Sequence, residues 1–90
     1  MRNFIRKSLT NAFHESRKGK NEFDYQFNRA DGDSISIKGS VSGTFKNRVA
    51  DFRIERIKSN GHHCSAIPVF GMPLTDKCIS DIVEIALENL

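Results

Sequence analysis

Residues 22–38 read "EFDYQFNRADGDSISIK" and hold two alternating stretches around a short polar segment. In the first stretch the aromatic residues fall at every second position, so they share one face of a strand while polar residues share the other. The second stretch repeats this pattern with isoleucine and serine. The sequence therefore predicts a β-hairpin with one apolar and one polar face.

The length of the loop between these strands sets their register. A two-residue turn at Asp31-Gly32 would place Phe27 opposite a serine, and so an apolar side chain opposite a polar one. A three-residue loop that begins at Ala30 places Phe27 opposite Ile35 and puts glycine at the left-handed position that such loops favour. The register favours the longer loop. We expect a charge pair between the residues that flank it, Arg29 and Asp33.

A second hairpin is predicted around Asn60-Gly61, a dipeptide that favours a type I′ turn because both residues accept a positive φ. It joins a third strand over about residues 49–58 to a fourth over about 62–70. Such a turn gives the pairs Ser59–His62, Ile57–Cys64, Ile54–Ile67 and Phe52–Val69. Pro68 cannot donate a backbone hydrogen bond, so the fourth strand is expected at an edge of the sheet.

Helical spacing of apolar residues marks both ends of the chain. The first helix is predicted over about residues 3–18 and ends before Gly19, a residue that favours helix termination. The last helix begins after Thr75, a favourable N-cap. The apolar stripes consist of Ile5, Leu9, Ala12 and Phe13 in the first helix, and of Ile79, Ile82, Val83, Ala86 and Leu90 in the last.

Together these elements predict an α+β fold, a four-stranded antiparallel meander with the N-terminal and C-terminal helices packed on one face. Ninety residues make a single domain, residues 1–90. The other face of the sheet is then open and carries Glu22, Asp24, Gln26, Ser34, Ser36, Lys38, Asp51, Arg53 and Glu55.

An apolar corner is expected at one end of that open face, formed by Ile57, Cys64, Ala66 and Phe70. Two interpretations of this corner follow from the sequence. An apolar cluster rimmed by mixed charges is typical of a protein-docking surface. Alternatively, Phe70 folds over an open edge of the core, because it stands directly before Gly71.

The triplet His62-His63-Cys64 does not predict a metal or catalytic site. Consecutive strand residues point to opposite faces, so three neighbours cannot converge on one ion, and no second ligand pair with zinc spacing is present. No residue is evident that would orient His62 as a base for Cys64 or Cys78. No phosphate-binding glycine motif follows a strand. We therefore expect no enzyme activity, no metal and no cofactor.

Composition is that of an ordinary globular chain, with 38% hydrophobic and 28% charged residues. No apolar run approaches the roughly 20 residues of a membrane span, and the N-terminus has no secretory-signal pattern. Two cysteines are too few for a disulfide scaffold. We expect a cytoplasmic protein without a membrane partner.

The net charge of +3 is unevenly distributed. Residues 1–20 hold six Lys or Arg and one acid, whereas residues 59–90 hold four acids and one Lys. The basic end could contact phosphates or an acidic protein surface. The residues predicted to bind a partner are Arg2, Arg6, Lys7, Arg17, Lys18, Lys20, Lys38, Arg53, Ile57 and Phe70.

The order helix, strands, helix is similar to that of double-stranded RNA-binding domains. In that family a lysine-rich motif opens the last helix and holds phosphates across a groove. The matching positions here read "LTDKCISD", where Lys77 stands alone among acids, and the hairpin at Asn60-Gly61 is an addition to the family's pattern.

We therefore expect a small non-enzymatic binding protein that docks on another protein or on a protein–nucleic-acid complex. Its size is typical of accessory or inhibitory factors of phages and mobile elements, such as anti-defence proteins, which is an analogy of size and fold. Direct DNA or RNA binding through the basic first helix is the alternative. Homodimerisation through a sheet edge or the Phe70 corner is a third interpretation.

Overall fold

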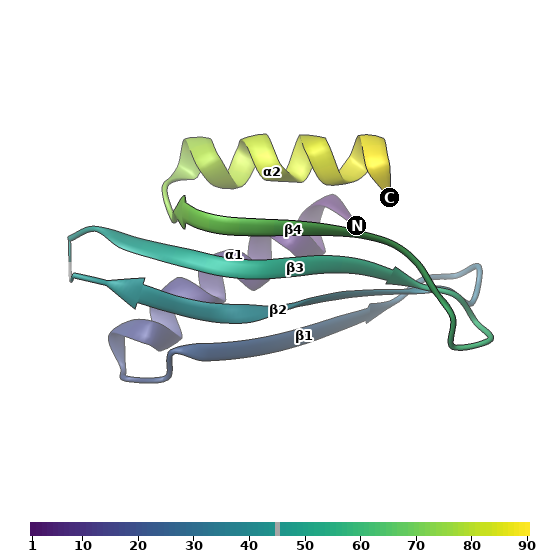
Figure 1. The fold of residues 1–90 in the computed structure, drawn as a ribbon, viewed down its shortest axis with the longest axis horizontal. Coiled ribbons are helices and arrows are strands. Elements are labelled where there is room, and N and C mark those ends of the chain that lie inside the picture. Colours follow the sequence, from purple (N-terminus) through teal and green to yellow (C-terminus); the bar gives the residue numbers. More distant parts are fainter. Residues whose placement is uncertain (45) are drawn as a thin grey trace.

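The computed structural model describes residues 1–44 and 46–90, and for His63 and Cys64 the backbone only. The four strands form one antiparallel sheet in chain order, β1-β2-β3-β4 (Figure 1). The predicted α+β meander with a helix at each end is confirmed. The elements are α1 (Arg2–Arg17), β1 (Glu22–Asn28), β2 (Ser34–Gly43), β3 (Arg48–Ile57), β4 (His63–Pro73) and α2 (Asp76–Asn89).

A single core lies between the two helices and the inner face of the sheet. In Figure 1, α1 crosses behind the strands at an oblique angle, and α2 runs alongside β4. Every strand of the sheet and both helices contribute apolar side chains to this core. Its buried members are Ile5, Leu9, Ala12, Phe23, Ile35, Ile37, Val41, Ala50, Phe52, Ile54, Ile79, Ile82, Val83 and Ala86.

The first hairpin has the predicted three-residue loop and register. Phe27 pairs with Ile35, and the Arg29 N–H donates to the Asp33 carbonyl oxygen at 2.8 Å. Gly32 has a φ of 91°, the left-handed value that the loop requires. The expected charge pair is wrong, however. The Arg29 guanidinium lies 3.3 Å from the Asp31 carboxylate, because the Asp33 carboxylate instead accepts a hydrogen bond from Arg56 of β3.

The second hairpin departs from its predicted type I′ turn. The Lys58 N–H donates to the His62 carbonyl oxygen and the Gly61 N–H to the Lys58 carbonyl oxygen, both at 2.8 Å. The loop is therefore three residues long, with a positive φ at Gly61 and at no described residue other than glycine. This loop frees Asn60 from the left-handed conformation and turns the Ser59 N–H toward the Asp33 carboxylate, at 3.2 Å.

A bulge restores the register beyond that loop. Ile57 pairs with His63 but Arg56 pairs with Ser65, so β4 carries one extra residue at this point. The predicted pair Ile57–Cys64 is wrong for this reason, and so is Ser59–His62, because His62 closes the loop with Lys58. Nearer the core the predicted pairs Ile54–Ile67 and Phe52–Val69 are confirmed.

The C-terminal end of α1 and the N-terminal end of α2 follow the predicted signals. Gly19 has a φ of 94°, and the Lys20 N–H donates to the Glu15 carbonyl oxygen at 3.0 Å, as in a Schellman motif. At the other helix, the Thr75 hydroxyl oxygen accepts a bond from the Cys78 N–H at 3.2 Å. These caps stabilise the two ends that join the helices to β1 and β4.

Only glycine fits at position 39, on the inner face of β2. Gly39 pairs with Phe23 on one side and Phe52 on the other. A Cβ atom at this position would overlap the Asp51 carbonyl oxygen and the Phe52 Cα. Since both are backbone atoms of the neighbouring strand, a side chain here must push β3 away from β2.

We expect Gly39→Ala to lower the free energy of unfolding by about 3 kcal/mol, the upper part of the range for overpacked sites. Urea denaturation monitored by circular dichroism measures the change. Ser40→Ala, the next residue on the opposite face, is the matched control and should change stability by less than about 0.5 kcal/mol. Equal stabilities of the two variants would contradict this role of Gly39.

Candidate functional site

The outer face of the sheet is open, as the sequence predicts. Its charged residues Asp24, Lys38, Asp51 and Arg53 are all exposed. Glu55 is the exception, because its side chain is only 11% exposed and lies 3.1 Å from the Arg53 guanidinium. The inner aromatic face is less uniform. Phe23 is buried, but Phe27 at the end of β1 is 38% exposed.

An apolar stripe of three residues, Ala66, Pro68 and Phe70, follows the outer face of β4. We call it the Phe70 stripe. All three residues are exposed, and they share one face because strand residues alternate. Phe70 is 81% exposed, so the interpretation that it folds over the core is wrong. Half-buried Ile57 lies on the neighbouring strand β3.

A second bulge in β4 holds Phe70 away from the core. Ala50 pairs with Met72 while Phe52 pairs with Val69, so Phe70 and Gly71 together lie opposite the single residue Asp51. Gly71 has a φ of 64°, and its N–H donates to the Asp51 carboxylate at 2.6 Å. The carboxylate thus stabilises the strand conformation that displays Phe70.

This bulge is missed by sequence reasoning, although a signal for it is present. Val69 and Met72 both face the core but stand three positions apart, which breaks the period of two. A glycine between them is the residue that a bulge with positive φ favours. The break in alternation along "AIPVFGMP" therefore indicates the bulge. The hydrogen bond to Asp51 is not indicated, because it depends on how β3 pairs with β4.

Some residues of the predicted basic surface pack against α2, and the others are exposed to solvent. The Arg2 guanidinium contacts the Glu84 carboxylate, and the Arg6 guanidinium donates to the Ser80 hydroxyl at 2.8 Å. Both contacts join α1 to α2. The acidic last helix therefore lies beside the basic first one and takes up two of its cations.

The other predicted cations lie farther along the chain. Lys7 is exposed beside β1, and Lys20 is exposed after the helix. The Arg17 guanidinium lies 5.8 Å from the centre of the Phe13 ring, and the Lys18 amine lies 3.8 Å from the Glu15 carboxylate. The first-helix cations and the outer-face residues thus belong to separate surfaces.

The structure brings together three of the remaining predicted residues. Lys38 pairs directly with Arg53, and Arg53 pairs with Pro68 of the Phe70 stripe. These three strands thus place two cations beside the apolar stripe. Lys38, Arg53 and Phe70 form one candidate surface on β2, β3 and β4. Ile57 pairs with His63 near the other end of β3, six positions from Asp51, so the predicted apolar corner of Ile57 and Phe70 is wrong.

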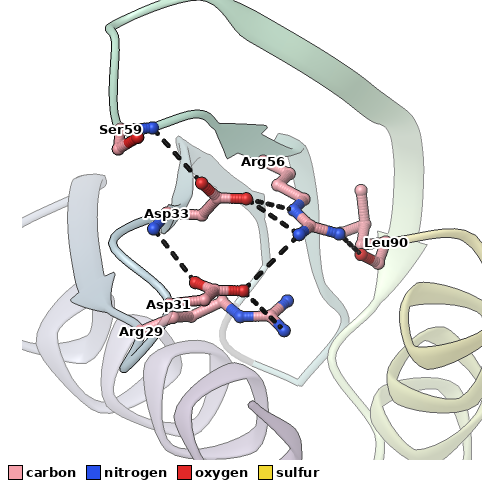
Figure 2. Close-up of polar contacts among 6 residues, drawn as sticks. All are labelled: Arg29, Asp31, Asp33, Arg56, Ser59 and Leu90. Carbon is pink, nitrogen blue, oxygen red and sulfur yellow. Dashed lines mark hydrogen bonds and ion pairs between the residues drawn. The ribbon is translucent and has the colours of Figure 1, made fainter.

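A polar cluster closes the loop end of the sheet, and the sequence did not predict it (Figure 2). The Arg56 guanidinium donates from Nε to the Asp33 carboxylate at 2.9 Å and from Nη1 to the Leu90 carbonyl oxygen at 2.8 Å. Its Nη2 also lies 3.6 Å from the Asp31 carboxylate. Arg56 therefore joins the first hairpin loop to the end of α2, and the Ser59 N–H joins the second loop to the same Asp33 carboxylate at 3.2 Å.

The hydrogen bond from Arg56 lowers the pKa of the Asp33 carboxyl below its ordinary value. Burial acts in the opposite direction, and the Ser59 N–H adds to the lowering. All the contacts of the cluster are internal, and Asp33 is buried. We therefore assign the cluster a stabilising role, separate from the candidate surface.

Lys77, the single cation at the position of the RNA-binding motif, is engaged within α2. Its amine donates to the Asp81 carboxylate at 2.9 Å, and this bond raises the pKa of Lys77. The side chains of His63 and Cys64, for which the sequence predicts opposite faces, lie outside the described residues. Among the described residues, no group of three or more His, Cys, Asp or Glu is placed to hold a metal ion.

Within the described part of the chain, neither helix has the length and apolar character needed to cross a membrane. Comparison with protein-family models, with curated proteins and with solved structures gives no match for this chain. The fold class is an α+β domain with a four-stranded antiparallel sheet. What the protein binds must therefore be inferred from its own surfaces.

We expect Asp33→Asn to destabilise the protein at neutral pH, because it removes the charge that Arg56 contacts. A carboxyl whose pKa is lowered by folding stabilises the folded state above its unfolded pKa, about 3.9, and loses this contribution as the pH falls through the folded value. The stability difference between wild type and Asp33→Asn should therefore be largest near pH 7 and shrink below about pH 4.

Urea denaturation between about pH 2 and pH 7 measures this difference. Asp24→Asn, at an exposed position on β1, is the matched control and should follow the wild-type profile. A difference between wild type and Asp33→Asn that stays constant over this range would argue against a role for the charge.

Proposed function

We propose that this protein is a non-enzymatic binding protein that docks on another protein, or on the protein part of a protein–nucleic-acid complex, through the Phe70 stripe. The observation that carries this proposal is the 81% exposure of Phe70 on a strand conformation stabilised by the Asp51 carboxylate. An aromatic side chain held in water by backbone geometry is a strong candidate for a binding anchor.

The surroundings of Phe70 support this proposal. Binding hot spots are large side chains that enter a pocket of the partner, surrounded by polar groups that exclude water. Here Lys38, Asp51 and Arg53 lie beside the stripe on neighbouring strands and are exposed. Such a mixed rim favours one orientation of the partner, since like charges placed opposite each other oppose binding.

The stripe is also preorganised. Pro68 has a restricted backbone, and β4 is hydrogen-bonded to β3 on both sides of the bulge. Binding therefore requires little ordering of this chain, which favours affinity. The proposed partner presents an apolar pocket for Phe70 and polar groups for Asp51 and Arg53.

An inhibitory role fits this mode of binding, because a rigid domain that covers a working surface of a larger assembly blocks it by occlusion. The support is the analogy of size and fold with accessory proteins of phages and mobile elements, including anti-defence proteins. A cytoplasmic location is part of the same proposal.

We expect Phe70→Ser to abolish capture of the partner when the full chain is immobilised and exposed to lysate of the source cell, with and without nuclease. Ile85→Ser is the matched control. Ile85 is also an exposed apolar residue, at 46% exposure, but it lies on α2. The proposal requires one protein captured by wild type and Ile85→Ser, resistant to nuclease and absent with Phe70→Ser. Unchanged capture by Phe70→Ser would contradict it.

Direct nucleic-acid binding is the second candidate function. The exposure of Lys7, Lys18 and Lys20 favours it, while the engagement of Arg2 and Arg6 by α2 weakens it. Three phosphate contacts would give a slope of about −2.7 for the logarithm of affinity against the logarithm of salt concentration. We expect filter binding to detect no retention of generic duplex at low salt. Retention with a slope near that value would favour the second candidate.

A further inference from the structure

The two edges of the sheet differ in how they are protected. β4 contains Pro68 and two register shifts, features that discourage pairing with another strand. β1 contains no proline, and its register with β2 is continuous over all seven residues. Within the part of the chain that the structure describes, β1 pairs only with β2. The outer edge of β1 is therefore a regular, unpaired strand edge.

The hydrogen bonds of the first hairpin show which backbone groups point outward. The Val41 N–H donates to the Asn21 carbonyl oxygen, and the Arg29 N–H donates to the Asp33 carbonyl oxygen. In an antiparallel ladder the bonded positions alternate, so the odd-numbered residues of β1 bond to β2. The N–H and C=O groups that point away from the sheet belong to Glu22, Asp24, Gln26 and Asn28.

A groove runs beside this edge, between β1 and the first half of α1. Its volume is about 1030 Å³. It forms because α1 crosses the sheet obliquely, so its N-terminal end diverges from the end of β1 (Figure 1). The residues that line it include Asn3, Phe4, Lys7, Asn11, Tyr25 and Phe27.

The groove combines an aromatic floor with a polar wall. Phe4 stacks on Phe27 with ring centres 5.4 Å apart, and Phe27 remains 38% exposed. On the helix side, the Asn11 amide donates to the Tyr25 hydroxyl at 2.6 Å. A strand that added to β1 would direct every second side chain into this groove, toward Phe4 and Phe27.

Lys7 sets the charge of the groove. It is exposed, and no acid among the described residues pairs with it. Arg6, which also lines the groove, donates to Ser80. Asp24 also lines the groove at its β1 rim, but it occupies an even position, so its side chain is directed to the outer face of the sheet. A carboxylate on the groove side of an added strand would therefore meet an uncompensated cation.

We infer that β1 and α1 form a strand-addition site for an extended segment of another protein, with an apolar side chain and a carboxylate on its groove-facing side. The backbone of the segment would bond to the even-numbered residues of β1, the apolar side chain would contact Phe4 and Phe27, and the carboxylate would approach Lys7. This site is independent of the Phe70 stripe, which lies on the opposite edge strand.

The charges disfavour a second copy of the chain as the occupant. A two-fold axis at Tyr25 would place two copies of β1 antiparallel and bring both Lys7 side chains to the same junction. On the outer face each copy would bring Lys38 opposite Asp24, so the charges of that face do not decide between the occupants. On the groove side two Lys7 amines would repel each other, whereas an acidic segment offsets Lys7.

The test uses the full-length chain and the capped peptide Thr-Val-Thr-Glu-Thr-Val-Thr, whose valines and glutamate share one face. Fluorescence anisotropy measures affinity, and amide chemical shifts locate the peptide. We expect binding in the micromolar to sub-millimolar range, with shifts in β1 and the first half of α1. Lys7→Glu should weaken binding at least about tenfold at low salt. Lys18→Glu, at the C-cap of the same helix and outside the groove, should stay within about twofold.

Two peptide variants separate the backbone from the charge. Methylation of the backbone nitrogens of the inner threonines should abolish binding, because it blocks the bonds to β1. Replacement of glutamate by lysine should weaken binding to wild type and restore it with Lys7→Glu. Phe70→Ser should leave all these affinities unchanged, so the result does not depend on the function proposed above.

Three outcomes would overturn this inference. The first is the absence of shifts in β1 at about 1 mM peptide, an affinity too weak for a specific site. The second is equal binding of the methylated peptide, which excludes strand addition. The third is a doubled mass in analytical ultracentrifugation with β1 amides protected by pairing, which assigns the edge to a second copy of the chain.

Discussion

The register of the antiparallel sheet is the constraint on which the rest of this structure depends. Apolar side chains of four strands reach the core together only when each strand keeps its phase, since a slip of one residue turns them outward. Two three-residue loops ending in Gly32 and Gly61 set the phase at the hairpins. Two bulges in β4 correct it where the strand has an additional residue. Gly39 lets the inner strands approach closely enough for this pairing.

The Arg56 cluster shows how the loops are held once the register is set. Arg56 follows Phe52 and Ile54 on the inner face, at the point where the core ends. Its guanidinium reaches the Asp33 carboxylate and the Leu90 carbonyl oxygen, and the same carboxylate accepts the Ser59 N–H. A charge at the boundary of the core is tolerated because its donors are satisfied. The cluster thus connects the two hairpin loops and the C-terminal end of α2.

The two edges of the sheet give the molecule two different candidate surfaces for binding. On β4 the bulge interrupts the strand and presents a side chain, Phe70, so recognition there would depend on an apolar anchor. On β1 the strand is regular and presents its backbone, so recognition there would depend on hydrogen bonds and on Lys7.

The sequence by itself determined the order of the elements, both helix ends, the first loop and the face of each strand that is buried. These features depend on residues only a few positions apart, where periodicity and turn chemistry act directly. Only the tertiary structure decided the length of the second loop, the partner of Asp33 and the exposure of Phe70. Each of these depends on contacts between different strands, and Arg2 meets Glu84 across 82 positions. Such contacts follow from how the strands and helices pack, which no local pattern specifies.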